Sequence, residues 1–186
     1  VIARARDTSN NSTDSLPINV TVANMQIVGL AAAYGFDEGA GTIASDASGH
    51  ANTANLQNGV AWVAGQHGTA ASFDGVNDYI SIPNSASTNI SGNALTISMW
   101  INPQPLASGD SVVVGKFWNT TMSSPYYQYG LELGGGNRTD FYIGTSSGPL
   151  TALNGTTLPF NQWSYLAITF DGAQVRTYVN GTLANT

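Results

Sequence analysis

Oxygen-bearing side chains gather in two short stretches of the sequence. In the first stretch, polar residues recur at every second position: Asp46, Ser48, His50 and Asn52. Ca²⁺ takes about six to eight oxygen ligands from flexible loops, and Gly49 allows the sharp bend that such a loop needs. This spacing predicts a loop that binds calcium as a structural ion.

The second stretch, residues 72–83, places Asp74, Asn77 and Asp78 around Gly75. Asp74 and Asp78 form a second candidate oxygen set for the same cation. The alternative for both stretches is that the acidic and amide side chains cap their own turns by hydrogen bonds to nearby backbone groups. Under that alternative the second stretch is a glycine-centred turn between two strands, and the Asp46 loop remains the first place to look for a metal.

Aromatic residues next to amides and charges suit a sugar ligand, because sugars present both apolar faces and hydroxyl groups. Trp118 and Tyr126 lie in a polar loop, and Asn137 and Arg138 could supply hydrogen bonds if the loops cluster. These residues form the predicted carbohydrate site; the alternative is that both rings pack beneath their own loop. The other tryptophans lie within alternating strands and are predicted to be core residues: Trp62, Trp100 and Trp163.

Catalytic groups are scarce. Glycosidases need two facing carboxylates, yet the only glutamates are Glu38, in a glycine-rich turn, and Glu132, which has no acidic neighbour in sequence. There is no G-x-S-x-G motif, and both histidines, His50 and His67, fall in predicted loops. The sequence therefore predicts a protein without catalytic activity.

Alternation of apolar and polar residues with a period of two dominates the chain and predicts strands. Asp-Gly at 171–172 and Asn-Gly at 180–181 favour tight hairpin turns. An all-β, two-sheet antiparallel jelly-roll sandwich accommodates this pattern. The expected strands of the main domain are residues 30–36, 60–63, 69–73, 79–82, 95–101, 111–117, 127–133, 139–144, 163–170, 174–179 and 182–184.

Three segments are expected. Residues 1–24 alternate on both sides of a polar loop and resemble the last two strands of an immunoglobulin-like or fibronectin-III-like repeat, as a short hairpin remnant. Residues 25–29 are the predicted linker, and residues 30–186 the main domain. We expect a piece of a longer polypeptide in which the final strands of the main domain are missing, leaving an exposed sheet edge.

The charge pattern limits the partners. The net charge is −6, and only five Lys and Arg residues are spread along 186 residues. Nucleic acids and anionic membranes attract clustered basic surfaces, so neither is an expected partner. No apolar run is long enough to span a bilayer, and the absence of cysteine excludes disulfides. A mildly acidic surface rich in Asn and Asp suits cations and neutral ligands.

Short motifs in a fixed order give the main domain a family resemblance. It is similar to bacterial laminin G-like domains of the concanavalin A-like lectin/glucanase superfamily. The motifs are YGFDEG at 34–39, DASG at 46–49, SFDG at 72–75, NDY at 77–79, ISMWI at 97–101, GK at 115–116, QW at 162–163 and VNG at 179–181.

The resemblance implies two antiparallel sheets and a place in a secreted or cell-surface multidomain protein, next to other domains of the same polypeptide. It also implies binding of glycans or extracellular proteins, with calcium in several members. We therefore expect a non-catalytic carbohydrate-binding module. The alternative is a structural spacer or protein-adhesion module with no glycan ligand.

Overall fold

The computed structural model describes residues 4–6, 8–9, 12–14, 28–90, 94–105, 109–117, 127–145, 148–152 and 155–186. The chain divides into two units, Val1–Leu30 and Ala31–Thr186. All regular structure in the described ranges is β-strand, so these ranges contain no helix that could cross a membrane.

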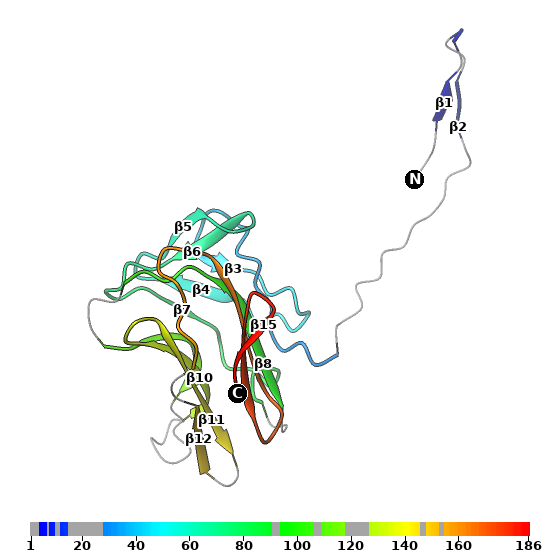
Figure 1. Cartoon of the computed structure of the whole chain (residues 1–186). Helices are drawn as coiled ribbons and strands as arrows, with labels where there is room; N and C mark the ends of the chain where they lie inside the picture. Colours follow the sequence, from blue (N-terminus) through cyan, green and yellow to red (C-terminus); the bar gives the residue numbers. More distant parts are fainter. Residues whose placement is uncertain are drawn as a thin grey trace. The chain divides into compact units, whose positions relative to one another are not determined.

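The N-terminal unit contains a short hairpin in which β1 (Arg4–Arg6) pairs with β2 (Ser12–Asp14) (Figure 1). β2 lies inside the stretch predicted as a loop. Pairing β1 with β2 closes a shorter loop than pairing it with the predicted strand at residues 18–22, and a shorter loop costs less conformational entropy. The second predicted strand, residues 18–22, lies outside the described residues, and the immunoglobulin-like origin of this unit stays a prediction.

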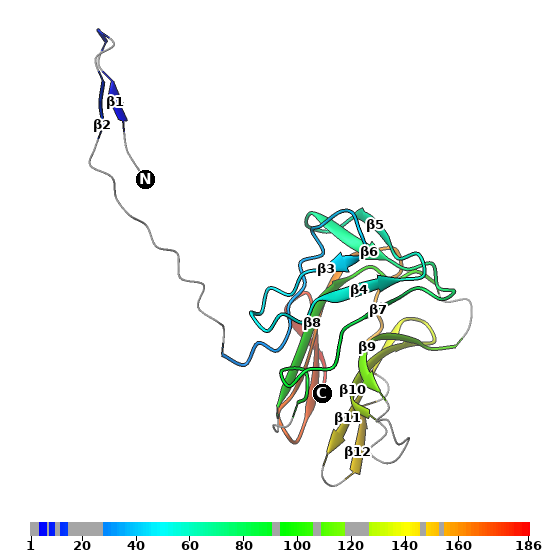
Figure 2. The same cartoon turned by 180° about the vertical axis from the view of Figure 1, so that it is seen from behind.

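The main unit is a sandwich of two four-stranded antiparallel sheets (Figures 1 and 2). One has the order β15-β14-β13-β8 and consists of Leu95–Ile101 (β8), Ser164–Phe170 (β13), Val175–Val179 (β14) and Thr182–Asn185 (β15). The other has the order β12-β11-β10-β9 and consists of Ser111–Phe117 (β9), Tyr127–Gly134 (β10), Arg138–Thr145 (β11) and Gly148–Ala152 (β12). The predicted all-β sandwich is confirmed.

Two smaller sheets lie at one end of this sandwich in both views (Figures 1 and 2). The first has the order β3-β4-β7 and consists of Ile43–Ala44 (β3), Ala54–Gln57 (β4) and Tyr79–Ser81 (β7). The second pairs Ala61–Ala64 (β5) with Thr69–Ser72 (β6).

Three local predictions were wrong. Residues 69–73 and 79–82 do not form a hairpin, because β6 pairs with β5 while β7 pairs with β4; the turn between them joins two sheets. Residues 30–36 make only a bridge from Tyr34 to Asp46, since Phe36 adopts a positive φ of 56° that ends the extended backbone. β12 lies where a polar excursion was expected.

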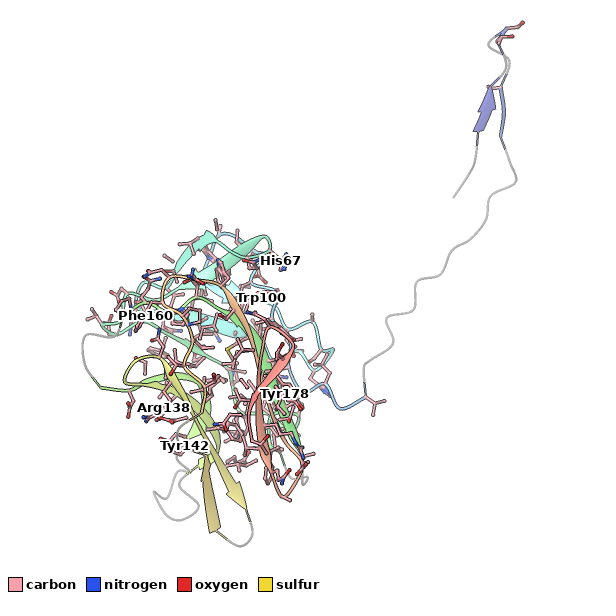
Figure 3. The ribbon with its side chains drawn as sticks, viewed as in Figure 1. His67, Trp100, Arg138, Tyr142, Phe160 and Tyr178 are labelled. Carbon is pink, nitrogen blue, oxygen red and sulfur yellow. The ribbon has the colours of Figure 1, made fainter. Side chains whose placement is uncertain are left out.

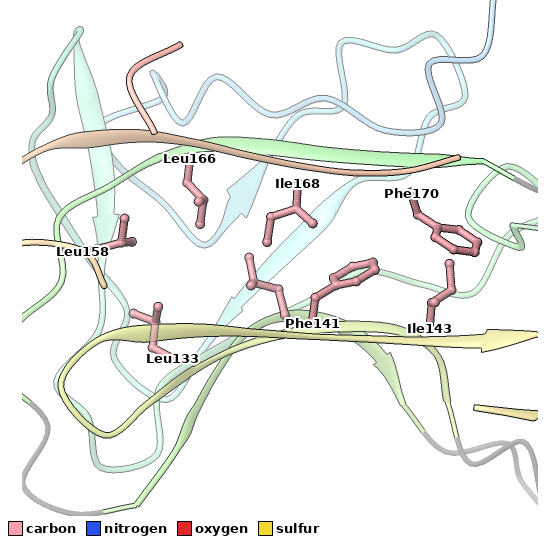
Figure 4. Packing of buried hydrophobic residues seen from close by; sticks show 8 residues of the cluster. Leu133, Phe141, Ile143, Leu158, Leu166, Ile168 and Phe170 are labelled. Carbon is pink, nitrogen blue, oxygen red and sulfur yellow. The ribbon is translucent and has the colours of Figure 1, made fainter. Parts of the chain in front are cut away.

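The core lies between the two large sheets (Figure 4). Along β13 every second side chain is buried, and Leu166, Ile168 and Phe170 point towards the opposite sheet. Side chains of β10 and β11, with one loop leucine, complete the cluster from the other side: Leu131, Leu133, Phe141, Ile143 and Leu158.

Shortening a core side chain should destabilise the whole sandwich. We expect Ile168→Ala to lower the free energy of unfolding by about 2–5 kcal/mol, because it removes buried methyl groups and leaves a cavity. Urea denaturation measures this change. Leu183→Ala, at a side chain that is 52% exposed, is the control and should stay within about 0.5 kcal/mol of the parent. Equal effects of the two changes would contradict the assignment of the core.

Candidate functional site

Exposed aromatic rings lie on the outer face of the sheet β15-β14-β13-β8. Because Leu166 points inward, its neighbour Tyr165 points outward, and the strand register pairs Tyr165 with Trp100 on β8. Their ring centroids are 5.4 Å apart at an interplanar angle of 55°. Trp100 is 42% exposed and Tyr165 is 37% exposed. Two large rings therefore stand side by side at the surface.

A third ring joins them from a different sheet. His67, in the turn between β5 and β6, meets the ring of Trp100 edge-on with centroids 5.5 Å apart at 71° (Figure 3). The turn is closed by a hydrogen bond from the Gly65 N–H to the Gly68 carbonyl (3.0 Å). We call His67, Trp100 and Tyr165 the aromatic group.

Hydrogen bonds hold Tyr165 in place. Its hydroxyl bonds with Ser98 Oγ (3.0 Å), and its backbone N–H donates to Asn180 Oδ1 (2.9 Å). The ring is thus anchored at both ends, while one side remains open to solvent. An exposed yet ordered aromatic surface with nearby hydroxyls is a suitable contact for a ligand that has both apolar and polar faces.

The prediction that Trp100 is a core residue was wrong. Leu95, Ile97, Met99 and Ile101 pack against the core, so the side chains of β8 between them face outward. Trp100 follows Thr96 and Ser98 at every second position of β8, so it points to the same outer face as these two polar residues. Their polar character is the signal in the sequence that this face is exposed. Trp62 is partly buried and donates its indole N–H to the Gly41 carbonyl (2.9 Å).

Of the sugar contacts predicted from sequence, Asn137 and Arg138 lie on the other large sheet or in its β10–β11 turn. Trp118 and Tyr126 are outside the described residues. Arg138 lies at the start of β11 on the other large sheet (Figure 3). Its guanidinium donates hydrogen bonds to Asp140 from Nε to Oδ1 (3.0 Å) and from Nη2 to Oδ2 (2.8 Å). Asn137 is 0% exposed, and neither atom of its amide has a hydrogen-bond partner among the described residues. A sugar contact by Asn137 stays a prediction that would require the turn to open.

Two carboxylates lie side by side on β10 and β11. Glu132 is the register partner of Asp140. Asp140 is held by Arg138, and Glu132 is hydrogen-bonded to Tyr142; burial and then Glu132 raise the pKa of Tyr142 to about 12. Both carboxylates thus have structural partners, so this pair is not arranged as a general acid and a base.

The carboxylate of Asp46 is the centre of the polar loop at residues 46–52. Its Oδ1 accepts hydrogen bonds from the backbone N–H groups of Ala33 (3.0 Å) and Ser48 (2.9 Å). Its Oδ2 accepts from the Ser48 hydroxyl (2.8 Å), the Asn52 N–H (2.9 Å) and the Asn52 amide (3.0 Å). One carboxylate therefore closes its own loop and ties the loop to Ala33.

The other predicted metal ligands take part in similar local contacts. His50 is exposed, and its backbone N–H donates to Ser48 Oγ (3.2 Å). Asp74 Oδ1 accepts from the Val76 N–H (2.8 Å), and Asp78 Oδ2 accepts from the Asp74 N–H (3.0 Å). These are the turn-capping bonds that the alternative interpretation describes.

Lys116 connects strand β9 to the loop at residues 84–89. Lys116, at the end of β9, donates from Nζ to neutral side-chain oxygens of residues 84–89: Asn84 Oδ1, Thr88 Oγ1 and Asn89 Oδ1. Burial lowers the pKa of this lysine. The same loop reaches the Asp46 loop, because Ser87 Oγ lies 3.0 Å from Asn52 Nδ2. The ammonium group of Lys116 therefore holds the loop at residues 84–89, and the carboxylate of Asp46 holds the loop at residues 46–52.

Calcium fits poorly in the Asp46 loop as it is arranged. The oxygens of Asp46 face N–H and O–H donors, whereas Ca²⁺ needs oxygen ligands around it. Within the described ranges, no three His, Asp or Glu side chains are grouped so that they could hold a metal. A calcium ion there would have to displace the hydrogen bonds that shape the loop.

We therefore expect the melting temperature to be the same in millimolar CaCl₂ and in EDTA. Differential scanning fluorimetry of the parent and of Asp46→Ala measures this. A rise of several degrees with calcium in the parent, lost in the variant, would instead establish the metal site predicted from the sequence.

The stability that Asp46 contributes should depend on pH. Burial raises the pKa of Asp46, but the hydrogen bonds from Ser48, Ala33 and Asn52 lower it more, so its pKa lies well below the usual range. The contribution is complete above the unfolded-state pKa of about 3.9 and is lost as the pH falls towards the folded-state value.

Asp46→Asn should cost about 2–3 kcal/mol at pH 7, since it leaves donors without an ionised acceptor. The difference from the parent should shrink below about pH 4. Denaturation at several pH values tests this, with the exposed Asp110→Asn as a control that stays within about 0.5 kcal/mol. A difference that does not change with pH would contradict the role of the carboxylate charge.

Similarities to solved structures agree with the fold. An S-layer domain-containing protein from Clostridium thermocellum ATCC 27405 (residues 221–444) aligns with a TM-score of 0.53 and 26% identity, over 83% of this chain and 70% of that chain. Domain 4 of AbnA, a GH43 extracellular arabinanase from Geobacillus stearothermophilus solved in complex with arabinotriose, aligns with a TM-score of 0.55 and 22% identity. That alignment covers 75% of this chain and 67% of the other, and at this identity it concerns the fold alone.

No curated protein sequence matches the chain significantly. The family model Laminin_G_3, described as the concanavalin A-like lectin/glucanases superfamily, matches residues 73–186, which are more than half of the chain. The match includes both large sheets and two of the three rings of the aromatic group, Trp100 and Tyr165. The chain therefore belongs to the Laminin_G_3 family of the concanavalin A-like lectin/glucanases superfamily.

Proposed function

We propose that the chain is a non-catalytic carbohydrate-binding module of a secreted or cell-surface protein, and that the aromatic group is its binding surface. The observation that carries this proposal is the pair of ordered, exposed rings of Trp100 and Tyr165. A sugar ring can lie against such a surface with its apolar face, while its hydroxyls reach side chains such as Ser98 beside it.

The chemistry of the surroundings supports a sugar more than a charged ligand. The outward-facing residues next to the rings on β8 are Ser98 and Thr96, and those on β13 are Ala167 and Thr169. None of them carries a charge. The related fold in AbnA was solved with arabinotriose, and both structural neighbours come from proteins named as extracellular or S-layer proteins. A secreted or surface location follows from the same proposal.

The second candidate is a structural spacer or adhesion module of a cell surface. The similarity to an S-layer domain-containing protein, at 26% identity, favours it. This candidate differs from the first in one measurable respect, because a spacer needs no glycan affinity.

Binding should depend on Trp100. We expect a glycan array that includes arabino-oligosaccharides to give a hit, and titration with that glycan to quench tryptophan fluorescence. Trp100→Ala should weaken binding by about 30-fold or more, the effect of removing a central aromatic contact worth about 2 kcal/mol.

Tyr79→Ala is the matched control, since Tyr79 is a tyrosine on β7 that is 50% exposed and lies on a different sheet. It should bind like the parent. Trp118→Ala tests the loop predicted from the sequence, and a loss there with normal binding by Trp100→Ala would move the site to that loop. Absence of any glycan hit at millimolar concentration would favour the spacer.

A further inference from the structure

The outer face of the sheet continues beyond the aromatic group to a further ring. Tyr178 on β14 is the register partner of Ala167, and Ala167 is the partner of Ser98. Since register partners in an antiparallel pair point to the same face, Tyr178 lies on the face that carries Trp100 and Tyr165. Rings from β8, β13 and β14 therefore share one surface.

Small side chains separate these rings. Ser98 and Ala167 occupy the row directly after Trp100 and Tyr165, and Tyr178 stands at the end of that row. Neighbouring strands are about 4.8 Å apart, so the surface from β8 to β14 extends about 10 Å across the strands. The row of small residues therefore lies between the aromatic group and Tyr178.

Arg176 marks the next row of the same face. It is the register partner of Thr169 and lies two residues before Tyr178. Its guanidinium is held through Nη1 by Asp171 Oδ2 (2.6 Å) and through Nη2 by Gln174 Oε1 (2.6 Å). The hydrogen bond from the Gln174 N–H and that from Arg176 lower the pKa of Asp171 to about 2, so the carboxylate balances the charge of the arginine.

We infer that this face binds several consecutive units of a linear, uncharged oligosaccharide, which runs from the aromatic group past Tyr178 to Arg176. The inference rests on the proposed function and adds the size and charge of its ligand. The path covers about 13 Å along the strands, which is four residue steps, and about 10 Å at right angles to them, so its diagonal length is about 16 Å and fits about three sugar units. Because Asp171 balances the charge of Arg176, Arg176 would contribute to ligand binding through hydrogen bonds and not through net charge.

The test is affinity as a function of ligand length. Isothermal titration uses arabino-oligosaccharides and xylo-oligosaccharides of one to six units. For the parent, affinity should rise with each added unit up to about three and then level off. Tyr178→Ala and Arg176→Gln should each weaken binding of the trimer and longer chains about tenfold and leave the dimer unchanged. Trp100→Ala should weaken binding at every length.

Other outcomes overturn the inference. If Tyr178→Ala and Arg176→Gln bind every length like the parent, or lose all lengths equally, the ligand does not extend along this face, although the proposed function stands. If the parent binds no member of either series and gives no hit on the glycan array, the proposed function fails together with the inference. Tyr79→Ala serves as the control for an unrelated tyrosine, and circular dichroism verifies that each variant keeps its β structure.

Discussion

The packing of two sheets through the alternate side chains of their strands is the constraint on which the rest of the molecule depends. Leu166, Ile168 and Phe170 of β13 point towards side chains of β10 and β11 across the sandwich. A strand has a side-chain period of two, so the burial of one set forces the other set outward. A slip of β13 by one residue would bury Tyr165 and expose Leu166, Ile168 and Phe170. The position of the exposed rings thus follows from the core.

Polar contacts organise the loops that the core does not reach. Asp46 gathers donors from its own loop and from Ala33, while Lys116 gathers neutral oxygens from residues 84–89. Each charged group is held by several hydrogen bonds, which stabilise an ion better than one surface contact would. Through Asn52 and Ser87 the two loops also contact each other. The carboxylate of Asp46 and the ammonium group of Lys116 thereby stabilise these loops, as a bound ion can do in other proteins.

The candidate binding surface combines a rigid part with a contribution from a turn. Trp100 and Tyr165 stand on paired strands of the main sheet, so the core fixes their spacing. His67 comes from the β5–β6 turn, and its position depends on how the small sheets sit at the end of the sandwich. Sites built on strands keep their geometry better than sites on loops, and this favours a preorganised surface for a ligand.

The sequence by itself determined the strands of the large sheets except β12, because alternation of apolar and polar residues indicates which side chains share a face. It also contained the turn-capping role of Asp74 and Asp78, since those hydrogen bonds reach only neighbouring residues. The outward position of Trp100 was not predicted, because its apolar neighbours suggested the core, although along β8 it alternates in step with the polar Thr96 and Ser98.

Only the tertiary structure decided which strands pair and which distant side chains meet. β6 joins β5 and β7 joins β4, although β6 and β7 are consecutive along the chain. His67, Trp100 and Tyr165 come together from one turn and two strands, and Asn137 is buried although it lies in the turn that joins β10 and β11. The physical reason is that periodicity is a local property, whereas pairing and burial are set by the packing of segments far apart in sequence.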